Sequence, residues 1–95
     1  MVADDYKKMM FYSYGITIED AGRYEGFIKH SLYKVYIPRL DAENHIISLK
    51  YCDCDMIILS RFSDVKRYIS ALKKKDPAYF THLMCEMLNI EGRSQ

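Results

Sequence analysis

Glycine, proline and tryptophan are scarce in this sequence: its 95 residues include four glycines, two prolines and no tryptophan. Collagen-like and low-complexity chains are rich in glycine and proline, so both classes are excluded. Long hydrophobic runs are also missing. The longest aliphatic run, Met56–Leu59, falls far short of the roughly 18 residues of a membrane-spanning helix, so we expect no membrane span.

Cysteine is scarce as well, and its count of three is odd. An odd count in a short chain argues against a disulfide framework and favours a reducing compartment. The chain begins with an acidic segment, whereas a secretory signal begins with basic residues followed by an apolar stretch. The two features together predict a cytoplasmic protein.

No excess of charge of either sign is present, because 14 Lys and Arg side chains oppose 13 Asp and Glu side chains. The charge of the whole molecule therefore indicates neither a polyanionic nor a polycationic partner. The hydrophobic content of 49% is high enough to form a core and excludes a disordered chain. The length fits one domain over residues 1–95, with a frayed tail at 91–95.

Three segments are predicted to be helices: 4–13, 64–75 and 77–90. Gly15 is expected to end the first, and Asp76 followed by Pro77 is typical of a helix start. The helical spacing of apolar residues in the last two segments predicts a buried set. Its members are Val65, Tyr68, Ile69, Leu72, Phe80, Leu83 and Met87.

Residues 16–31 fit two structures, and the sequence does not decide between them. One is a capped helix, which Gly22 and Gly26 would each weaken by roughly 1 kcal/mol. The other is a hairpin with strands at 16–18 and 23–28 around a turn at 20–22.

The β signal is concentrated between residues 32 and 62. Alternating apolar residues predict three antiparallel strands, at 32–38, 45–51 and 56–62. Such a sheet has one face that must be covered, and the helices before and after it can cover that face. The predicted fold class is therefore α+β: an antiparallel β-meander of three or four strands with an N-terminal helix and two C-terminal helices packed on one face.

Sequence signatures of catalysis are absent, since the sequence has neither a phosphate-binding glycine loop nor a nucleophile elbow. We therefore predict that the chain is not an enzyme. A cofactor is indicated only by two pairs of soft metal ligands. Cys52 and Cys54 would converge on a turn, and His82 and Cys85 on a helix, which predicts a zinc site if the pairs meet. The alternative is that these cysteines are small apolar side chains without a metal.

Basic side chains gather in one segment, where residues 61–75 carry six cations and one acid. The cationic positions of the predicted helix lie away from its apolar stripe. Together with the cation that precedes the helix, the predicted binding set is Arg61, Lys66, Arg67, Lys73 and Lys74. Such a face can bind a phosphate backbone or an acidic protein patch, or it can be an ordinary solvated helix surface.

Nine tyrosines are a high number for a chain of this length, and tyrosine is enriched at recognition surfaces. In the predicted strand 32–38, Tyr36 lies beside Lys34 on the face opposite the core. We therefore add Tyr36 to the predicted binding residues. An aromatic beside a lysine on an open sheet face can also stack on nucleic-acid bases.

The segment Arg61-Phe62-Ser63-Asp64, which follows an apolar strand and precedes a helix, resembles the end of the third strand of a PX domain. The resemblance covers about fifteen residues and implies phosphoinositide binding. Val65 stands where that family has an aromatic residue, and the family's proline-rich stretch beyond the helix is missing.

These observations predict a small non-catalytic binding protein of the inhibitor or adaptor type, such as viruses and mobile elements encode. Its expected partner is a protein. A nucleic-acid-binding module that uses the basic helix is the alternative, and a zinc-stabilised or metal-sensing protein is the third. A second copy of the chain is a further partner that the sequence leaves open.

Overall fold

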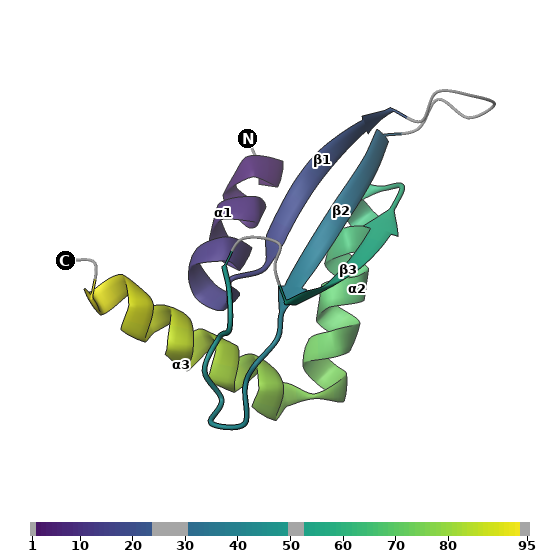
Figure 1. The fold of residues 1–95 in the computed structure, drawn as a ribbon. Helices are drawn as coiled ribbons and strands as arrows, with labels where there is room; N and C mark the ends of the chain where they lie inside the picture. Colours follow the sequence, from purple (N-terminus) through teal and green to yellow (C-terminus); the bar gives the residue numbers. More distant parts are fainter. Residues whose placement is uncertain (1, 24–30, 50–52, 94–95) are drawn as a thin grey trace.

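The protein has an α+β fold in which one antiparallel sheet is covered by helices on one face (Figure 1). The computed structural model describes residues 2–23, 31–49 and 53–93. The elements in chain order are α1 (Val2–Tyr14), β1 (Thr17–Arg23), β2 (Ser31–Pro38), β3 (Cys54–Leu59), α2 (Phe62–Lys75) and α3 (Pro77–Arg93). The predicted fold class is confirmed.

Helix α1 begins with the acidic side chains of Asp4 and Asp5, which interact favourably with the positive end of the helix dipole. Gly15 ends it in the left-handed region, with φ of 70°. The Gly15 N–H donates to the Phe11 carbonyl over 2.8 Å, so a carbonyl of the last turn gains a partner. The predicted first helix and its end are confirmed.

Residues 17–23 of the ambiguous segment form strand β1 and not a helix. Strand β1 pairs with β2 in antiparallel register from Thr17 opposite Tyr36 to Arg23 opposite Ser31. The predicted turn at 20–22 is wrong: these residues form a bulge within β1, where the Gly22 N–H donates to the Asp20 carboxylate over 3.0 Å. The same Asp–Gly chemistry suits turns and bulges, so local sequence did not separate them. Of the predicted strand 23–28, the positions after Arg23 lie outside the described residues.

The predicted strand 45–51 is also wrong over the described residues 45–49. They belong to a loop in which the Asp41 carboxylate accepts the N–H groups of Glu43 and His45. Asn44 adopts a left-handed φ of 65° there, and one isolated bridge joins Leu40 to Ile46. Ile46 packs against the core from this loop, whereas Ile47, which contributed to the predicted strand pattern, is exposed. Residues 50 and 51 lie outside the described part of the chain.

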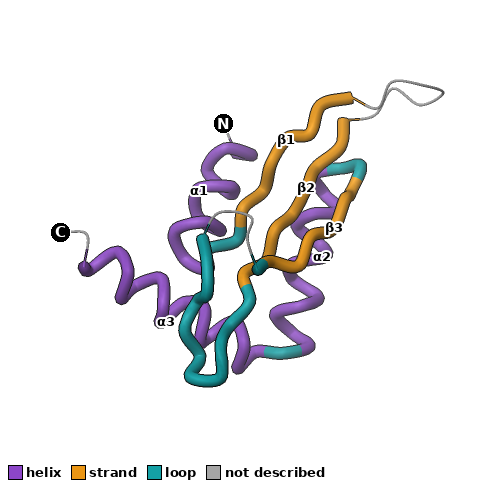
Figure 2. Tube along the Cα trace, in the orientation of Figure 1, coloured by secondary structure: helices purple, strands orange, loops and turns teal. Residues whose placement is uncertain are grey.

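The sheet has the strand order β1-β2-β3 (Figure 2). Its inner face holds the core. Ile18, Val35 and Ile57 form one rung across the three strands. Strand β3 ends at Leu59, earlier than predicted, because Phe62 already begins α2. The buried hydrophobic residues are Met10, Tyr14, Ile16, Ile18, Val35, Ile37, Val65, Ile69, Phe80, Leu83 and Met87. Five of the seven residues predicted to be buried are in this set, whereas Tyr68 and Leu72 are half-buried.

A single residue, Asp76, separates α2 from α3 and serves both helices. Its backbone N–H donates to the Leu72 carbonyl at the end of α2 over 2.9 Å. Its carboxylate accepts the Tyr79 N–H in the first turn of α3 over 3.1 Å. Pro77 follows as the first residue of α3, where its missing N–H has no consequence. The predicted helix start at Asp76-Pro77 is confirmed.

Gly15 lies where α1, β2, α3 and the loop after β2 meet. A Cβ atom at this position would lie 3.1 Å from the Met87 Sδ atom and 3.2 Å from the Pro38 Cγ atom. It would also lie 3.5 Å from the Leu49 Cδ2 atom. Gly22 has a similar φ of 80°, but a Cβ atom there would meet nothing within 4 Å.

Gly15 and Gly22 share a left-handed backbone but differ in how closely they are packed, so substitutions at the two positions can be compared directly. Both Gly15→Ala and Gly22→Ala force an L side chain into the left-handed region, which costs about 1–2 kcal/mol. Gly15→Ala also overpacks the junction, for a total loss of about 2–4 kcal/mol in the free energy of unfolding. Urea denaturation followed by circular dichroism measures both values. Equal losses for the two variants would contradict the close packing at Gly15.

Candidate functional site

Helix α2 carries a basic face, which we define as Lys66, Arg67, Lys73 and Lys74. The core side of α2 is marked by the buried Val65 and Ile69. With 100° between successive residues, the four cations occupy the outer surface and the flank toward α1. Arg61 is exposed immediately before the helix. The structure therefore places the four predicted cations of α2 on adjoining sides of the helix.

Two of these lysines lie over aromatic rings. The Lys66 Nζ atom is 5.4 Å from the centroid of the Tyr6 ring and 5.8 Å from that of Phe62. The Lys73 Nζ atom is 4.9 Å from the centroid of the Tyr14 ring. Both contacts have cation–π geometry and, through the tyrosines, connect α2 to α1.

The tyrosine rings beneath these lysines also contact phenylalanine rings, as does the ring of Tyr33. The rings of Tyr6 and Tyr33 meet Phe62 edge-on at centroid distances of 5.5 and 5.6 Å, and Tyr14 meets Phe80 in the same way. Burial, followed by the nearby Tyr14, raises the pKa of Tyr6 above its usual value. Tyr6, Tyr14 and Tyr33 thus help to hold the helices and the sheet together.

The outer cations of the basic face have no acidic partner among the described residues. The ion pairs in that part of the chain are Arg39–Asp55, His45–Glu43 and His45–Glu86. None of them includes a residue of α2. The positive charge of Arg67 and Lys74 is therefore available to a partner.

The aromatic contacts distinguish two kinds of lysine on the basic face. We expect Lys66→Ser and Lys73→Ser each to lower the free energy of unfolding by about 0.5–1 kcal/mol, because each removes a cation–π contact. Lys74→Ser is the matched control, and we expect no measurable loss. Chemical denaturation of the three variants checks this, and equal stability of all three would mean that the ring contacts contribute nothing.

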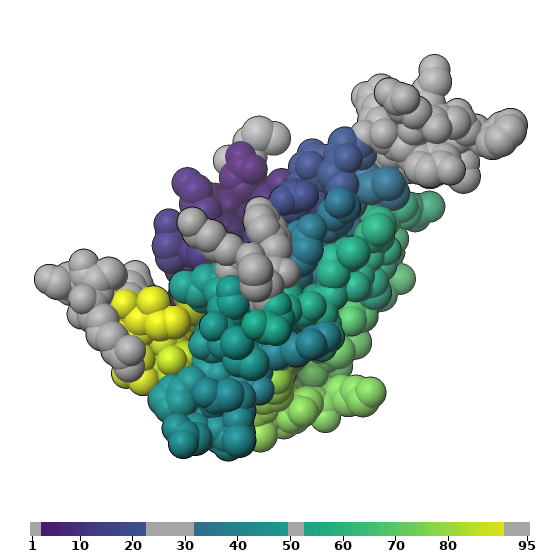
Figure 3. Space-filling view, viewed as in Figure 1, coloured from purple at the N-terminus to yellow at the C-terminus, as the bar shows by residue number. Residues whose placement is uncertain are grey.

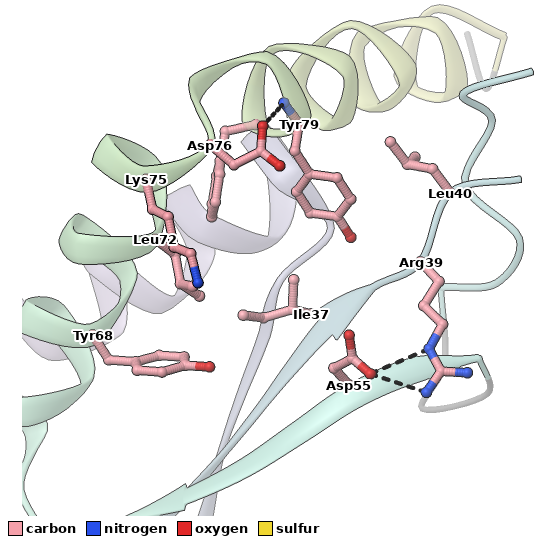
Figure 4. A pocket seen from close by; sticks show the side chains of 10 residues that line it. Ile37, Arg39, Leu40, Asp55, Tyr68, Leu72, Lys75, Asp76 and Tyr79 are labelled. Carbon is pink, nitrogen blue, oxygen red and sulfur yellow. Dashed lines mark hydrogen bonds and ion pairs between the residues drawn. The ribbon is translucent and has the colours of Figure 1, made fainter. Parts of the chain in front are cut away.

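A pocket of about 430 Å³ opens between the sheet and the corner formed by α2 and α3 (Figure 4). Its floor is apolar and its rim carries charged and hydroxyl groups. The lining residues are Ile37, Arg39, Leu40, Asp55, Tyr68, Leu72, Lys75, Asp76, Tyr79 and Phe80. Tyr68 and Leu72 are only half-buried because they form the α2 wall of this pocket. The volume lies in the range of small-molecule and anchor-residue sites.

The polar groups of the rim are largely held by the protein itself. The Arg39 guanidinium donates from Nη2 and Nε to one Asp55 carboxylate oxygen, over 2.9 and 3.2 Å, and this contact raises the pKa of Arg39. The Tyr79 hydroxyl donates to the Pro38 carbonyl. Burial, followed by the charge of Asp55, raises the pKa of Tyr79. Within the described part of the chain, Lys75 is the rim cation that takes part in no ion pair.

The outer face of the sheet carries Tyr36, as predicted from the alternation in β2. It is half-buried, and the register places it between Thr17 and Met56. Lys34 lies on the same face, opposite Ile58. Met56 and Ile58 are 50% and 49% exposed. Helix α2 lies behind the sheet in Figure 1. Figure 3 shows the molecule from the same side and therefore looks onto the outer face.

The predicted zinc ligands are not brought together as a set among the described residues. Cys54 is half-buried in β3, while His82 and Cys85 are exposed on α3. No group of three or more His, Cys, Asp and Glu side chains with metal-binding geometry occurs within the described ranges. Cys52 lies outside these ranges, so the four-ligand site stays a prediction.

Helix α3 instead presents a buried carboxylate to the loop after β2. Glu86 is 8% exposed, and its Oε2 atom lies 3.2 Å from the His45 Nδ1 atom. A buried carboxylate is costly without a partner, so this contact explains how the loop is fixed to α3. The sequence analysis had placed no role on either residue.

Comparison with protein families, curated proteins and solved structures finds no match for this chain. The PX resemblance therefore depends on Arg61 to Asp64 and their flanking strand and helix alone. Among the described residues, none of the helices combines the length and the apolar composition needed to cross a membrane.

Proposed function

We propose that this chain is a small non-catalytic binding protein of the inhibitor or adaptor type, and that it binds a protein segment with a large apolar side chain flanked by acidic residues. The observation that carries the proposal is the pocket between the sheet, α2 and α3. The apolar side chain enters the pocket, and the acidic residues meet Lys75 at its rim.

The floor of the pocket favours an apolar occupant. Ile37 from β2 and Leu72 from α2 lie on facing sides of the pocket (Figure 4). Phe80 from α3 also lines it. Filling such a floor with a hydrocarbon group removes apolar surface from water on both sides of the contact. Apolar anchors that fill preformed pockets carry much of the affinity in protein interfaces.

The charges around the pocket favour an acidic neighbour for that anchor. Arg39 and Asp55 neutralise each other, and the Asp76 carboxylate accepts a hydrogen bond at the start of α3. Lys75 contributes the rim charge that has no ion-pair partner among the described residues. Lys75 lies in the last turn of α2 and places a positive charge at this end of the pocket, whereas Lys73 lies over the Tyr14 ring on the other side of the helix.

The same contacts support binding over catalysis. A catalytic acid or base must be available to a substrate. In the pocket the Tyr79 hydroxyl is engaged with a backbone carbonyl, and the Asp55 carboxylate is held by Arg39.

A peptide-display selection on the immobilised protein tests the proposal. We expect enrichment of peptides that place one Leu, Ile, Phe or Met between Asp and Glu residues. Lys75→Glu should reverse the flanking preference toward Lys and Arg, because it inverts the charge at the rim. The matched control is Lys8→Glu, an equal charge change on the exposed surface of α1. It should leave the selected motif unchanged.

Two results would reject the proposal. One is a selected motif without an apolar anchor or unaffected by Lys75→Glu. The other is an NMR titration in which the best peptide shifts neither Tyr68 nor Leu72 resonances. Both residues line the pocket wall, so a peptide that leaves them unchanged is not bound there.

Nucleic-acid binding is the second candidate, and the unneutralised outer cations of the basic face favour it. Phosphate contacts release condensed cations, so affinity for a fluorescent oligonucleotide should fall steeply with salt. The double variant Arg67→Ser/Lys74→Ser should weaken binding by more than tenfold without changing stability. Anisotropy titrations at several salt concentrations measure this. Binding that is equal for the double variant and the parent protein would exclude the basic face as a nucleic-acid site.

A further inference from the structure

Tyr68 brings a hydroxyl group into the pocket from α2. Figure 4 shows this hydroxyl directed toward the space beside Ile37. Within the described ranges it makes no hydrogen bond, in contrast to the Tyr79 hydroxyl, which donates to the Pro38 carbonyl. The Tyr68 hydroxyl can therefore bond to an occupant of the pocket.

The ammonium group of Lys75 lies on the same wall. Residues 68, 72 and 75 are four and three positions apart, so their side chains share one face of α2. In Figure 4 the Lys75 side chain runs past Leu72 and directs its nitrogen toward the same space as the Tyr68 hydroxyl. Among the described residues Lys75 takes part in no ion pair. A cation and a hydroxyl thus flank Leu72 and face the apolar floor.

The two carboxylates that line the pocket do not fill this space. Asp55 lies across the pocket from Tyr68, where one of its oxygens accepts both bonds from Arg39 (Figure 4). The Asp76 carboxylate accepts the Tyr79 N–H and is directed toward α3, away from Ile37. The α2 wall therefore keeps one positive charge that these carboxylates leave available.

A carboxylate matches the two groups of this wall. Its two oxygens only accept hydrogen bonds, while an ammonium group donates three and a phenol donates one. Hydrogen bonds to an ionised group are also the stronger ones. One cation balances one negative charge, whereas a phosphate group carries about −1.5 to −2. The expected ligand is a monoanionic carboxylate joined to an apolar group that covers Ile37 and Leu72.

The depth of the two groups in the pocket indicates which carboxylate of a protein fits. In an extended segment, neighbouring side chains point to opposite faces. The Asp or Glu beside an anchor residue therefore cannot follow the anchor into the pocket, and its carboxylate stays at the rim. A C-terminal residue differs, because its own carboxylate is bonded to the Cα atom that carries the apolar side chain. Both groups of that residue can enter one pocket.

We propose that the pocket binds the C-terminal residue of a partner protein. Its apolar side chain packs on Ile37 and Leu72, and its carboxylate accepts hydrogen bonds from the Lys75 Nζ atom and the Tyr68 hydroxyl. This inference rests on the proposed function, since it uses the same pocket, and it adds a defined end of the partner chain. Capture of a terminal carboxylate is a recurring mode of peptide recognition.

Three short peptides, each N-acetylated and with one leucine, test the inference by NMR titration of the intact protein. The first is Gly-Asp-Gly-Leu with a free C-terminal carboxylate, and the second is the same peptide with a C-terminal amide. The third is amidated Gly-Asp-Leu-Asp-Gly, in which the leucine is internal. We expect the free acid to bind about tenfold or more tightly than its amide, because the amide loses the bonds to an ionised group. It should also bind more tightly than the internal peptide.

Two variants test the two donors separately. Tyr68→Phe removes the hydroxyl and keeps the ring, and Lys75→Met removes the charge and keeps most of the stem. Each should lower the preference for the acid over the amide to about threefold or less, without weakening the amide. Tyr12→Phe and Lys8→Met are the matched controls on the exposed surface of α1. They should keep the preference of the parent protein.

Equal affinities for the free acid and its amide would overturn the inference. So would an acid preference that either Tyr68→Phe or Lys75→Met retains, and so would the absence of shifts at millimolar peptide. Tighter binding of the internal peptide would also overturn it, but would support the proposed function, because an anchor between acidic residues would then suffice. The display selection reports on internal motifs by itself, so the two proposals can fail separately.

Discussion

The arrangement of the whole chain depends on the absence of a side chain at Gly15. Helix α1 ends there, and Pro38, Leu49 and Met87 approach the same point from β2, the following loop and α3. A glycine allows both the left-handed backbone and this close approach. Because α3 can then pack against α1, the start of α3 is held at the end of the sheet. The position of α2 follows, since one residue joins it to α3.

The pocket is a result of this arrangement. Helix α2 covers the middle of the sheet through Val65 and Ile69, but its last turns diverge from β3 toward the junction with α3. The divergence leaves Tyr68 and Leu72 half-buried, while Ile37 stays buried at the floor of the pocket. Because the helices cover a single face of the sheet, its other face retains exposed apolar residues at Met56 and Ile58. The pocket and the exposed outer face thus have one cause, a small set of helices that covers the sheet incompletely.

The sequence predicted the structure correctly where neighbouring residues determine it, as at the ends and inner sides of the helices. Asp76 followed by Pro77 predicted the start of α3, and the spacing of Val65 and Ile69 predicted the inner side of α2. It failed at 45–49, where Ile46 packs on the core and Ile47 is exposed, in a loop that the Asp41 carboxylate organises. The pocket was beyond local reasoning, because residues from Ile37 to Phe80 line it and only the tertiary fold brings them together. The spacing of apolar residues in α2 correctly placed its cations on the sides away from the core. The contacts of Lys66 and Lys73 with the tyrosine rings of α1 were not predicted, because they too depend on the tertiary fold.

Because a single residue connects α2 and α3, the connection fixes which side of α3 faces the sheet once α2 is in place. Successive helical residues are 100° apart, so one inserted residue that extended either helix would turn Tyr79 and Phe80 away from the sheet. Deletion of a residue would turn them the opposite way. The walls of the pocket would then no longer face each other, although every side chain that lines it would still be present. Variation in chain length should therefore not be tolerated at Asp76.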